Sequence, residues 1–196
     1  GIMHIVTVCT ANQCRSVMMA ATLADAFAQL RRPLVIESAG VDAHAGAPPT
    51  EEVVAALRRR NLDHLVRSHA ARPIEEVAAH GVDLVVAAER AHLLPIIEIV
   101  RVDRFRVYTI DELATLVAST PATDHEPLDA YLQRLTESRS LGSFLGAGPG
   151  AHDLSDPTGR GRRAHRKTLD ALIDTSRLVA AALPAPSTGS TRTAPS

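Results

Sequence analysis

Residues 6–16 read VTVCTANQCRS, a run in which a short apolar strand changes into a helix. Five residues separate Cys9 from Arg15, which lets the backbone curl around a tetrahedral oxyanion with several main-chain N–H groups pointing inward. The anion then rests on the N-terminus of a helix, and a thiol placed there beside an arginine is favoured as the thiolate at neutral pH. The run therefore predicts an oxyanion-binding loop with Cys9 as a nucleophile.

The residues on either side of this loop support that interpretation. Residues 4–8 alternate apolar and β-branched side chains like a strand, and residues 18–27 have helical spacing. The loop would lie at the carboxyl end of a strand, where open α/β sheets bind ligands. Arg15 offers a planar fork of donors that matches two phosphoryl oxygens. Without this context, Cys9 fits a buried cysteine that only packs.

Composition limits the class of protein and its partners. The chain has 196 residues, a net charge of −1 and 45% hydrophobic residues, as expected for one globular domain with no nucleic-acid partner. No apolar run reaches the ~20 residues that cross a bilayer, so we expect a cytoplasmic monomer without a membrane partner. Both cysteines fall in the loop, and nine histidines lack metal-ligand spacing. We predict no metal and no cofactor.

Strand-like and helix-like segments alternate along the chain. Strands are predicted near residues 4–8, 34–37, 83–87 and 105–108, and helices near 16–30, 50–60, 90–100, 111–118, 126–138 and 162–182. This order predicts an α/β fold, a single domain over residues 3–183 with an open parallel four-stranded sheet and helices on both faces. Residues 141–150 read as a glycine-rich loop, and residues 184–196 as a disordered tail.

Residues 9–16 resemble the signature loop of the low-molecular-weight protein tyrosine phosphatases, whose phosphatase I-like fold also serves one class of arsenate reductases. Four further segments resemble the family in the expected order: residues 37–40, 45–49, 67–72 and 83–89. Asp156-Pro157 is similar to the acid loop of the family. The resemblance therefore covers most of residues 3–183.

The resemblance implies a two-step reaction through a phosphocysteine intermediate. Cys9 would attack phosphorus while Arg15 binds the phosphoryl oxygens, and Asp156 would protonate the leaving group and later activate water. Read from the residues alone, Asp156 fits a turn or helix-cap aspartate, and Asp153 lies close enough in sequence to be confused with it.

The other loop residues receive supporting roles. The resemblance implies that Ser16 hydrogen-bonds the thiolate, and that Ser38 and His69 form a network with Asn12, which tolerates a left-handed backbone. Cys14 is either a buried structural thiol or the partner of Cys9 in a protective, reversible disulfide. The predicted phosphate-binding residues are Thr10, Ala11, Asn12, Gln13, Cys14 and Ser16.

The sequence departs from the family where the substrate is held. His44 and Thr158 stand where family members stack aromatic rings on phosphotyrosine, Gln13 replaces an apolar residue, and Val17 replaces a proline. These changes weaken the expectation of phosphotyrosine specificity. The basic stretch at residues 160–167 is interpreted as a solvated helix face or as a surface that attracts anionic substrates.

The leading hypothesis is a cysteine-dependent phosphatase that acts on phosphotyrosine in proteins or on a related phosphomonoester. An arsenate reductase is the first alternative, and it would need a low-molecular-weight thiol because no cysteine lies outside the loop. A phosphate-binding protein without turnover is the second. The predicted partner is a phosphorylated protein or a small phosphomonoester.

Overall fold

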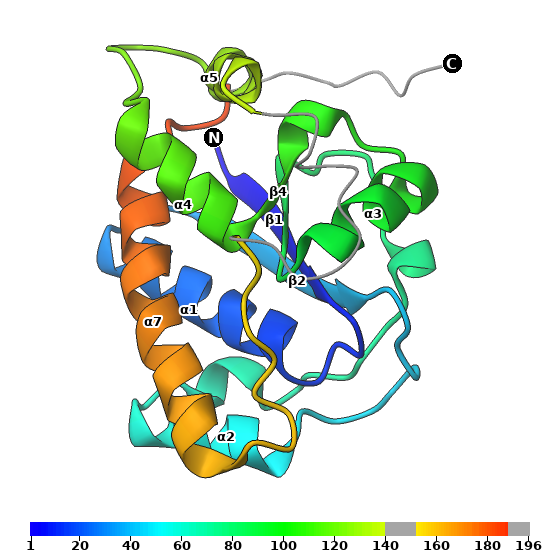
Figure 1. Cartoon of the computed structure of the whole chain (residues 1–196). Helices are drawn as coiled ribbons and strands as arrows, with labels where there is room; N and C mark the ends of the chain where they lie inside the picture. The colour runs from blue at the N-terminus through cyan, green and yellow to red at the C-terminus, as the bar shows by residue number, and fades with distance from the viewer. Residues whose placement is uncertain (140–151, 188–196) are drawn as a thin grey trace.

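The computed structural model describes residues 1–139 and 152–187. Its sheet contains β1 (Met3–Cys9), β2 (Leu34–Gly40), β3 (Leu84–Ala87) and β4 (Val107–Thr109), all paired in parallel in the order β2-β1-β3-β4 (Figure 1). The predicted parallel four-stranded sheet is confirmed. Because β1 lies between β2 and β3, its carboxyl end is the point where the strand order reverses, and such points form ligand-binding crevices.

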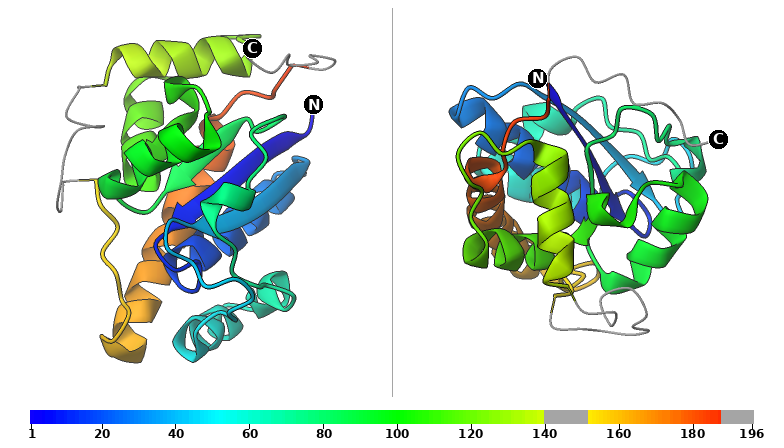
Figure 2. Two further views of the ribbon diagram at one scale, coloured as in Figure 1. Left: turned by 90° about the vertical axis from the view of Figure 1, so that its right-hand side faces the viewer. Right: turned by 90° about the horizontal axis from the view of Figure 1, so that it is seen from above.

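Helices cover both faces of the sheet. One face carries α1 (Arg15–Gln29), α2 (Glu51–Arg59), α4 (Ile110–Ser119), α5 (Leu128–Glu137) and α7 (Gly161–Ala182), and the other carries α3 (Leu93–Val100). Figures 1 and 2 show α7 running along α1 and α4. Short 3-10 turns complete the chain: η1 (Asp63–Val66), η2 (Ile74–Glu76), η3 (Arg90–His92) and η4 (Arg104–Arg106).

The central strand shows why the sequence folds this way. In β1, Met3 and Ile5 belong to the core under α1 and α7, whereas Val6 and Val8 belong to the core under α3. All four side chains are at most 1% exposed. A strand covered on both faces needs apolar residues at successive positions, as in other parallel α/β sheets.

Two element boundaries differ from the prediction. The helix predicted over residues 90–100 is divided into η3 and α3, and Pro95 lies in the first turn of α3, where its missing N–H costs no helical hydrogen bond. The last strand begins at Val107 because residues 104–106 form η4, from which Arg106 donates to both carboxylate oxygens of Asp129 at 3.0 and 2.8 Å.

Other expectations concern the ends of the described ranges. The predicted glycine-rich loop 141–150 and residues 188–196 of the predicted tail lie outside the described residues. The structure does describe residues 184–187, and Pro186 is buried there, next to Gly1. Within the two described ranges, no helix combines the length and apolar character needed to span a bilayer.

Candidate active site

The loop between β1 and α1 directs its carbonyl groups toward neighbouring elements. The carbonyl oxygens of five loop residues accept hydrogen bonds of 2.7–3.1 Å: Cys9 from Val41 N, Thr10 from Asp42 N, Asn12 from His69 Nε2, Gln13 from Thr50 N and Cys14 from Met18 N. By contrast, no backbone N–H from Thr10 to Cys14 donates to another group within the described residues. These N–H groups are therefore available to a bound oxyanion.

Asn12 holds the loop in this shape. Its backbone is left-handed, with φ = 57°, a conformation that asparagine tolerates better than most residues. The side-chain amide donates to Ser16 Oγ and to Ser38 Oγ, both at 2.9 Å. Its oxygen accepts from the backbone N–H of Arg72 at 3.0 Å. The structure thus brings Asn12, Ser38 and His69 together through hydrogen bonds.

Gly40, at the end of β2, lets the loop approach the sheet closely. A Cβ added at this position would lie 2.4 Å from the carbonyl oxygen of Thr10 and 3.0 Å from the backbone nitrogen of Asn12. Both neighbours are backbone atoms, which cannot turn aside as a flexible side chain can. The position therefore requires glycine if the loop is to keep its place.

Cys9 is buried, and its Sγ lies 3.0 Å from Ser16 Oγ. The Ser16 oxygen also accepts from the Asn12 amide at 2.9 Å, so the hydroxyl links the sulfur to the Asn12 side chain.

The first turn of α1 follows the loop directly. No side chain caps its N-terminus, and the turn contains no acidic residue. In contrast, α2 and α4 each have a threonine cap and two acidic residues in the first turn. The N-terminus of α1 therefore offers its unpaired N–H groups and positive dipole end to an anion.

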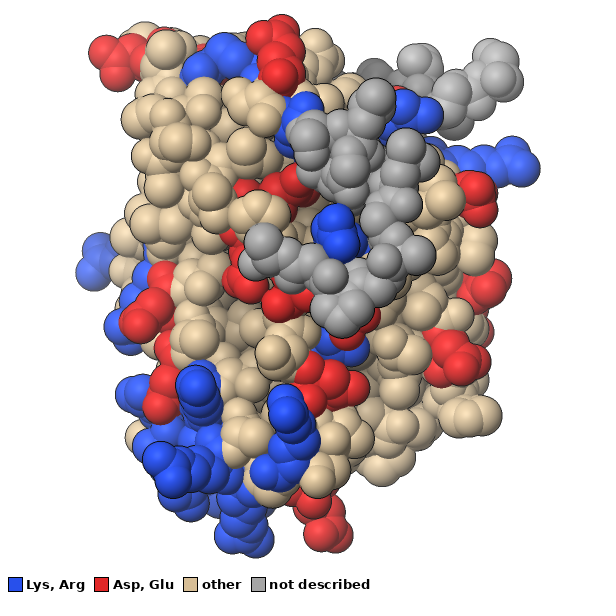
Figure 3. Space-filling model, in the orientation of Figure 1, with Lys and Arg blue, Asp and Glu red and all other residues tan. Residues whose placement is uncertain are grey.

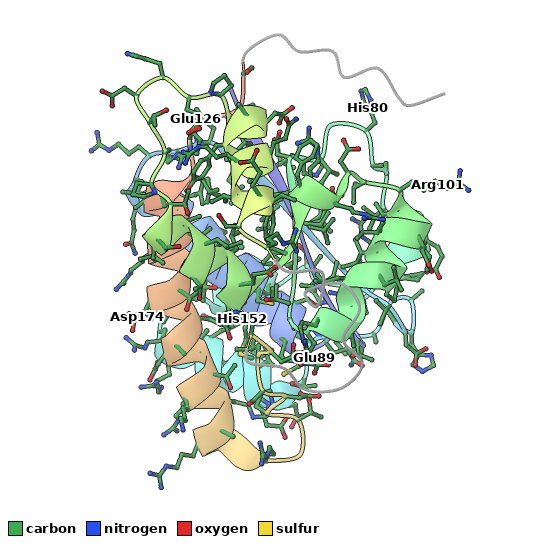
Figure 4. The ribbon with its side chains drawn as sticks, turned by 45° about the horizontal axis from the view of Figure 1, so that its top comes forward. His80, Glu89, Arg101, Glu126, His152 and Asp174 are labelled. Carbon is green, nitrogen blue, oxygen red and sulfur yellow. The ribbon has the colours of Figure 1, made fainter. Side chains whose placement is uncertain are left out.

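Arg15 is 3% exposed and is held from two sides. Its Nη1 donates to Glu89 and to the carbonyl oxygen of Leu154, the latter at 2.9 Å. Its Nη2 lies 3.8 Å from Asp156 Oδ2. Glu89 lies two residues after the end of β3, at the same end of the sheet as the start of α1 (Figure 4). The guanidinium is therefore fixed before any substrate arrives.

The structure places the two aspartates near Pro157 against different partners. Asp153 accepts from the backbone N–H of Arg90 at 2.8 Å, whereas Asp156 faces Arg15. Burial would raise the pKa of Asp156, but hydrogen bonds from Thr158 and the charge of Arg15 outweigh burial and lower it. The Thr158 N–H donates to Asp156 Oδ1 at 3.0 Å. Asp156 is thus both a turn residue and a neighbour of Arg15.

His92 is a buried site residue that the sequence did not suggest. Its Nδ1 accepts from the Glu89 N–H at 3.1 Å, so its other nitrogen carries the proton and donates to Thr10 Oγ1 at 3.0 Å. Burial and the charge of Arg15 lower the pKa of His92 to about 4. The neutral ring therefore connects η3 to the loop. Its signal in the sequence is its position three residues after Glu89, just beyond the end of a buried strand.

The remaining predicted residues lie at or near the loop. Cys14 is buried, and burial is the main cause that raises its pKa to about 12, so it is a protonated thiol. Both cysteines are free. Gln13 donates from Nε2 to the carbonyl oxygen of Pro48 at 2.8 Å. His44 and Thr158, at the positions of the missing aromatic rings, are exposed. Within residues 1–139 and 152–187, no cluster of three or more His, Cys, Asp or Glu side chains is placed to hold a metal ion.

The sheet topology, the amide-lined loop, the buried thiol and the buried guanidinium together define an α/β protein of the cysteine-phosphatase type. The family model for low molecular weight phosphotyrosine protein phosphatase matches residues 4–130. The chain belongs to this family.

Individual relatives agree with this assignment. The protein-arginine-phosphatase of Bacillus subtilis (strain 168) is 31% identical over 113 residues, which cover 58% of this chain and 73% of the relative. The crystal structure of a YwlE mutant from Bacillus subtilis has a TM-score of 0.68 at 24% identity, covering 91% of this chain and 97% of the other. A low molecular weight protein tyrosine phosphatase from T. tengcongensis has a TM-score of 0.65 at 24% identity, covering 90% and 97%.

Proposed function

We propose that this chain is a cysteine phosphatase that removes a phosphoryl group from protein side chains through a phosphocysteine at Cys9. One observation carries the proposal: the loop N–H groups from Thr10 to Cys14 have no partner within the described residues, and they lie between a buried thiol and a buried guanidinium. This combination can hold a tetrahedral oxyanion and attack it from the sulfur side.

In the first step, the Cys9 sulfur forms a bond to phosphorus while the bond to the leaving group breaks. Arg15 binds two equatorial oxygens and stabilises the charge that they gain in the transition state. Asp156 gives its proton to the leaving atom. A bound phosphoryl dianion balances the charge of Arg15 and so favours the protonated form of Asp156 on which this step depends.

In the second step, Asp156 accepts a proton from water as the water oxygen attacks phosphorus. The S–P bond breaks, phosphate leaves, and the Cys9 thiolate is restored. The Ser16 hydroxyl, 3.0 Å from the sulfur, stabilises that thiolate as a leaving group. Proton and charge are thus balanced over the cycle without a metal ion taking part in either step.

For the substrate, we favour phosphoarginine over phosphotyrosine. Exposed His44 and Thr158 replace the expected aromatic rings, so the stacking that favours phosphotyrosine is reduced. A guanidine leaving group becomes a cation when it is protonated, and the Asp156 carboxylate then lies beside it. The relative from Bacillus subtilis that carries the name protein-arginine-phosphatase supports this choice. Phosphotyrosine is the second candidate, because the matching family model carries that name.

The test is a comparison of kcat/KM on one peptide carrying phosphoarginine, phosphotyrosine or phosphoserine, with an aryl phosphate as a small substrate. We expect phosphoarginine to react fastest, Cys9→Ser to be inactive and Arg15→Lys to lose nearly all activity. Faster hydrolysis of phosphotyrosine would overturn the choice of substrate alone. Undiminished turnover by Cys9→Ser would overturn the phosphocysteine mechanism.

A further inference from the structure

A cavity lies beside residues 153–157, outside the oxyanion loop. It has a volume of about 570 Å³, and Asp156 and Pro157 line it together with one face of α7. Because Asp156 also faces Arg15, the cavity begins where the proposed phosphoryl site ends. Whatever occupies it would belong to the part of a substrate next to the phosphorylated group.

Three cations from α7 and the turn before it line this cavity: Arg160, Arg163 and Lys167. Their spacing of three and four residues puts them on one side of the helix. All three are exposed, and none forms a salt bridge within the described residues. By comparison, Arg59 and Arg60 both pair with Asp170, at 3.0 and 2.8 Å.

The start of α7 is an unfavourable place for these cations. Its N-terminus has no capping side chain and no acidic residue in its first turn. Positive charges near a helix N-terminus oppose the helix dipole. The chain therefore concentrates cations where they reduce helix stability, and a bound anion would compensate both the cations and the unpaired N–H groups.

Three carboxylates also line the cavity. Asp156 faces Arg15, and Asp153 accepts from the N–H of Arg90. Burial raises the pKa of Asp111, so its negative charge is disfavoured. The wall formed by α7 consequently remains attractive to an anion. Figure 3 shows Lys and Arg gathered at the lower end of the molecule, where Figure 1 places the start of α7 and α2.

We propose that this cavity, which we call the α7 subsite, binds an acidic side chain of the substrate polypeptide close in sequence to the phosphorylated residue. The inference rests on the proposed function, because it needs a protein substrate at the oxyanion loop. Arg163 and Lys167 supply charge-assisted hydrogen bonds to the acidic group, and Leu154 and Pro157 contact its apolar stem. The α7 subsite thereby selects phosphorylation sites with acidic neighbours.

The helix offers its own control for this proposal. Arg162 and Arg166 line a different cavity, of about 350 Å³, together with Arg58 and Arg59 of α2. Two double variants can therefore be compared: Arg163→Ala/Lys167→Ala and Arg162→Ala/Arg166→Ala. Each removes two exposed cations from the same two turns of α7. A long-range attraction of anions would respond equally to both pairs, whereas the α7 subsite responds only to the first.

The experiment measures the Kd of phosphopeptides on a Cys9→Ser background by calorimetry, so the readout does not require turnover. One peptide has acidic residues beside the phosphorylated residue, and a matched peptide has alanine there. We expect the acidic peptide to bind about tenfold more tightly than the alanine peptide. This ratio should fall to about one in Arg163→Ala/Lys167→Ala and persist in Arg162→Ala/Arg166→Ala. Thermal melts followed by circular dichroism confirm that all variants fold.

Equal binding of the two peptides, or equal losses in both double variants, would overturn the α7 subsite. A failure of the proposed function would give a different result. The wild-type protein would then hydrolyse an aryl phosphate but none of the phosphopeptides, whatever their flanking residues. Binding selectivity on the Cys9→Ser background would still report on the α7 subsite in that case, so the two proposals can fail separately.

Discussion

Replacement of Asn12 tests how the loop keeps its shape. The side chain takes part in three hydrogen bonds, to Ser16, Ser38 and Arg72, at 2.9–3.0 Å, and the residue is fully buried. At about 1 kcal/mol net for each hydrogen bond, their loss lowers the free energy of unfolding by about 3 kcal/mol. Alanine also has to adopt the left-handed backbone at φ = 57°, which adds a penalty of about 1 kcal/mol.

We therefore expect Asn12→Ala to lose about 4 kcal/mol and Asn12→Gly about 3 kcal/mol, since glycine adopts a positive φ readily. Urea unfolding followed by far-ultraviolet circular dichroism measures both values, a suitable probe for a chain without tryptophan. Both variants should also lose kcat toward an aryl phosphate, because the Ser16 hydroxyl is no longer oriented toward Cys9. Wild-type stability in both variants, or a glycine variant less stable than the alanine variant, would refute the reasoning.

Three further perturbations address other parts of the site. Because the pKa of His92 is lowered to about 4, the unfolded chain binds more protons at this position between pH 6.5 and 4. The free energy of unfolding of the wild type should therefore fall by about 3 kcal/mol from pH 6.5 to pH 4 on account of His92. His92→Asn should flatten this decline. An unchanged dependence of the unfolding free energy on pH in the variant would contradict the prediction. Asp156→Ala should slow aryl phosphates with poor leaving groups at least about tenfold more than those with good ones, so uniform slowing in a leaving-group series would exclude Asp156 as the acid. In Gly40→Ala the added Cβ would lie 2.4 Å from a loop carbonyl oxygen. This variant should weaken inhibition by inorganic phosphate by more than about tenfold. An unaltered inhibition constant would show that the loop does not depend on this close approach.

Local pattern was sufficient to predict the sheet and the loop. Alternating apolar residues marked β1, and the spacing of Cys9 and Arg15 placed an oxyanion loop at its carboxyl end. These features are contained in one short segment of chain, where sequence order and spatial order coincide. The predicted boundaries failed where a tertiary contact decided them, as at η4, where Arg106 pairs with Asp129.

Two residues that brace the loop from a distance, Glu89 and His92, were not predicted. Glu89 is 74 positions from the arginine that it contacts, and His92 is 82 positions from Thr10. Neither has a local pattern that distinguishes it from a surface or helix-terminal residue. The register of β1 with β3 brings them close, and that register depends on packing across the whole sheet. A topological argument, that polar residues directly after a central strand face the crevice, would have pointed to Glu89.

The uncapped first turn of α1 has a consequence for the protein between turnovers. Unlike α2 and α4, each of which has a threonine cap, α1 has no capping side chain and leaves its first N–H groups to a molecule from solution. Folding is therefore linked to anion binding at the oxyanion loop. An oxyanion that binds only the native state adds RT ln(1 + [L]/Kd) to the free energy of unfolding. The melting temperature should climb with the concentration of inorganic phosphate, so that the product of the reaction also protects the resting enzyme against heat.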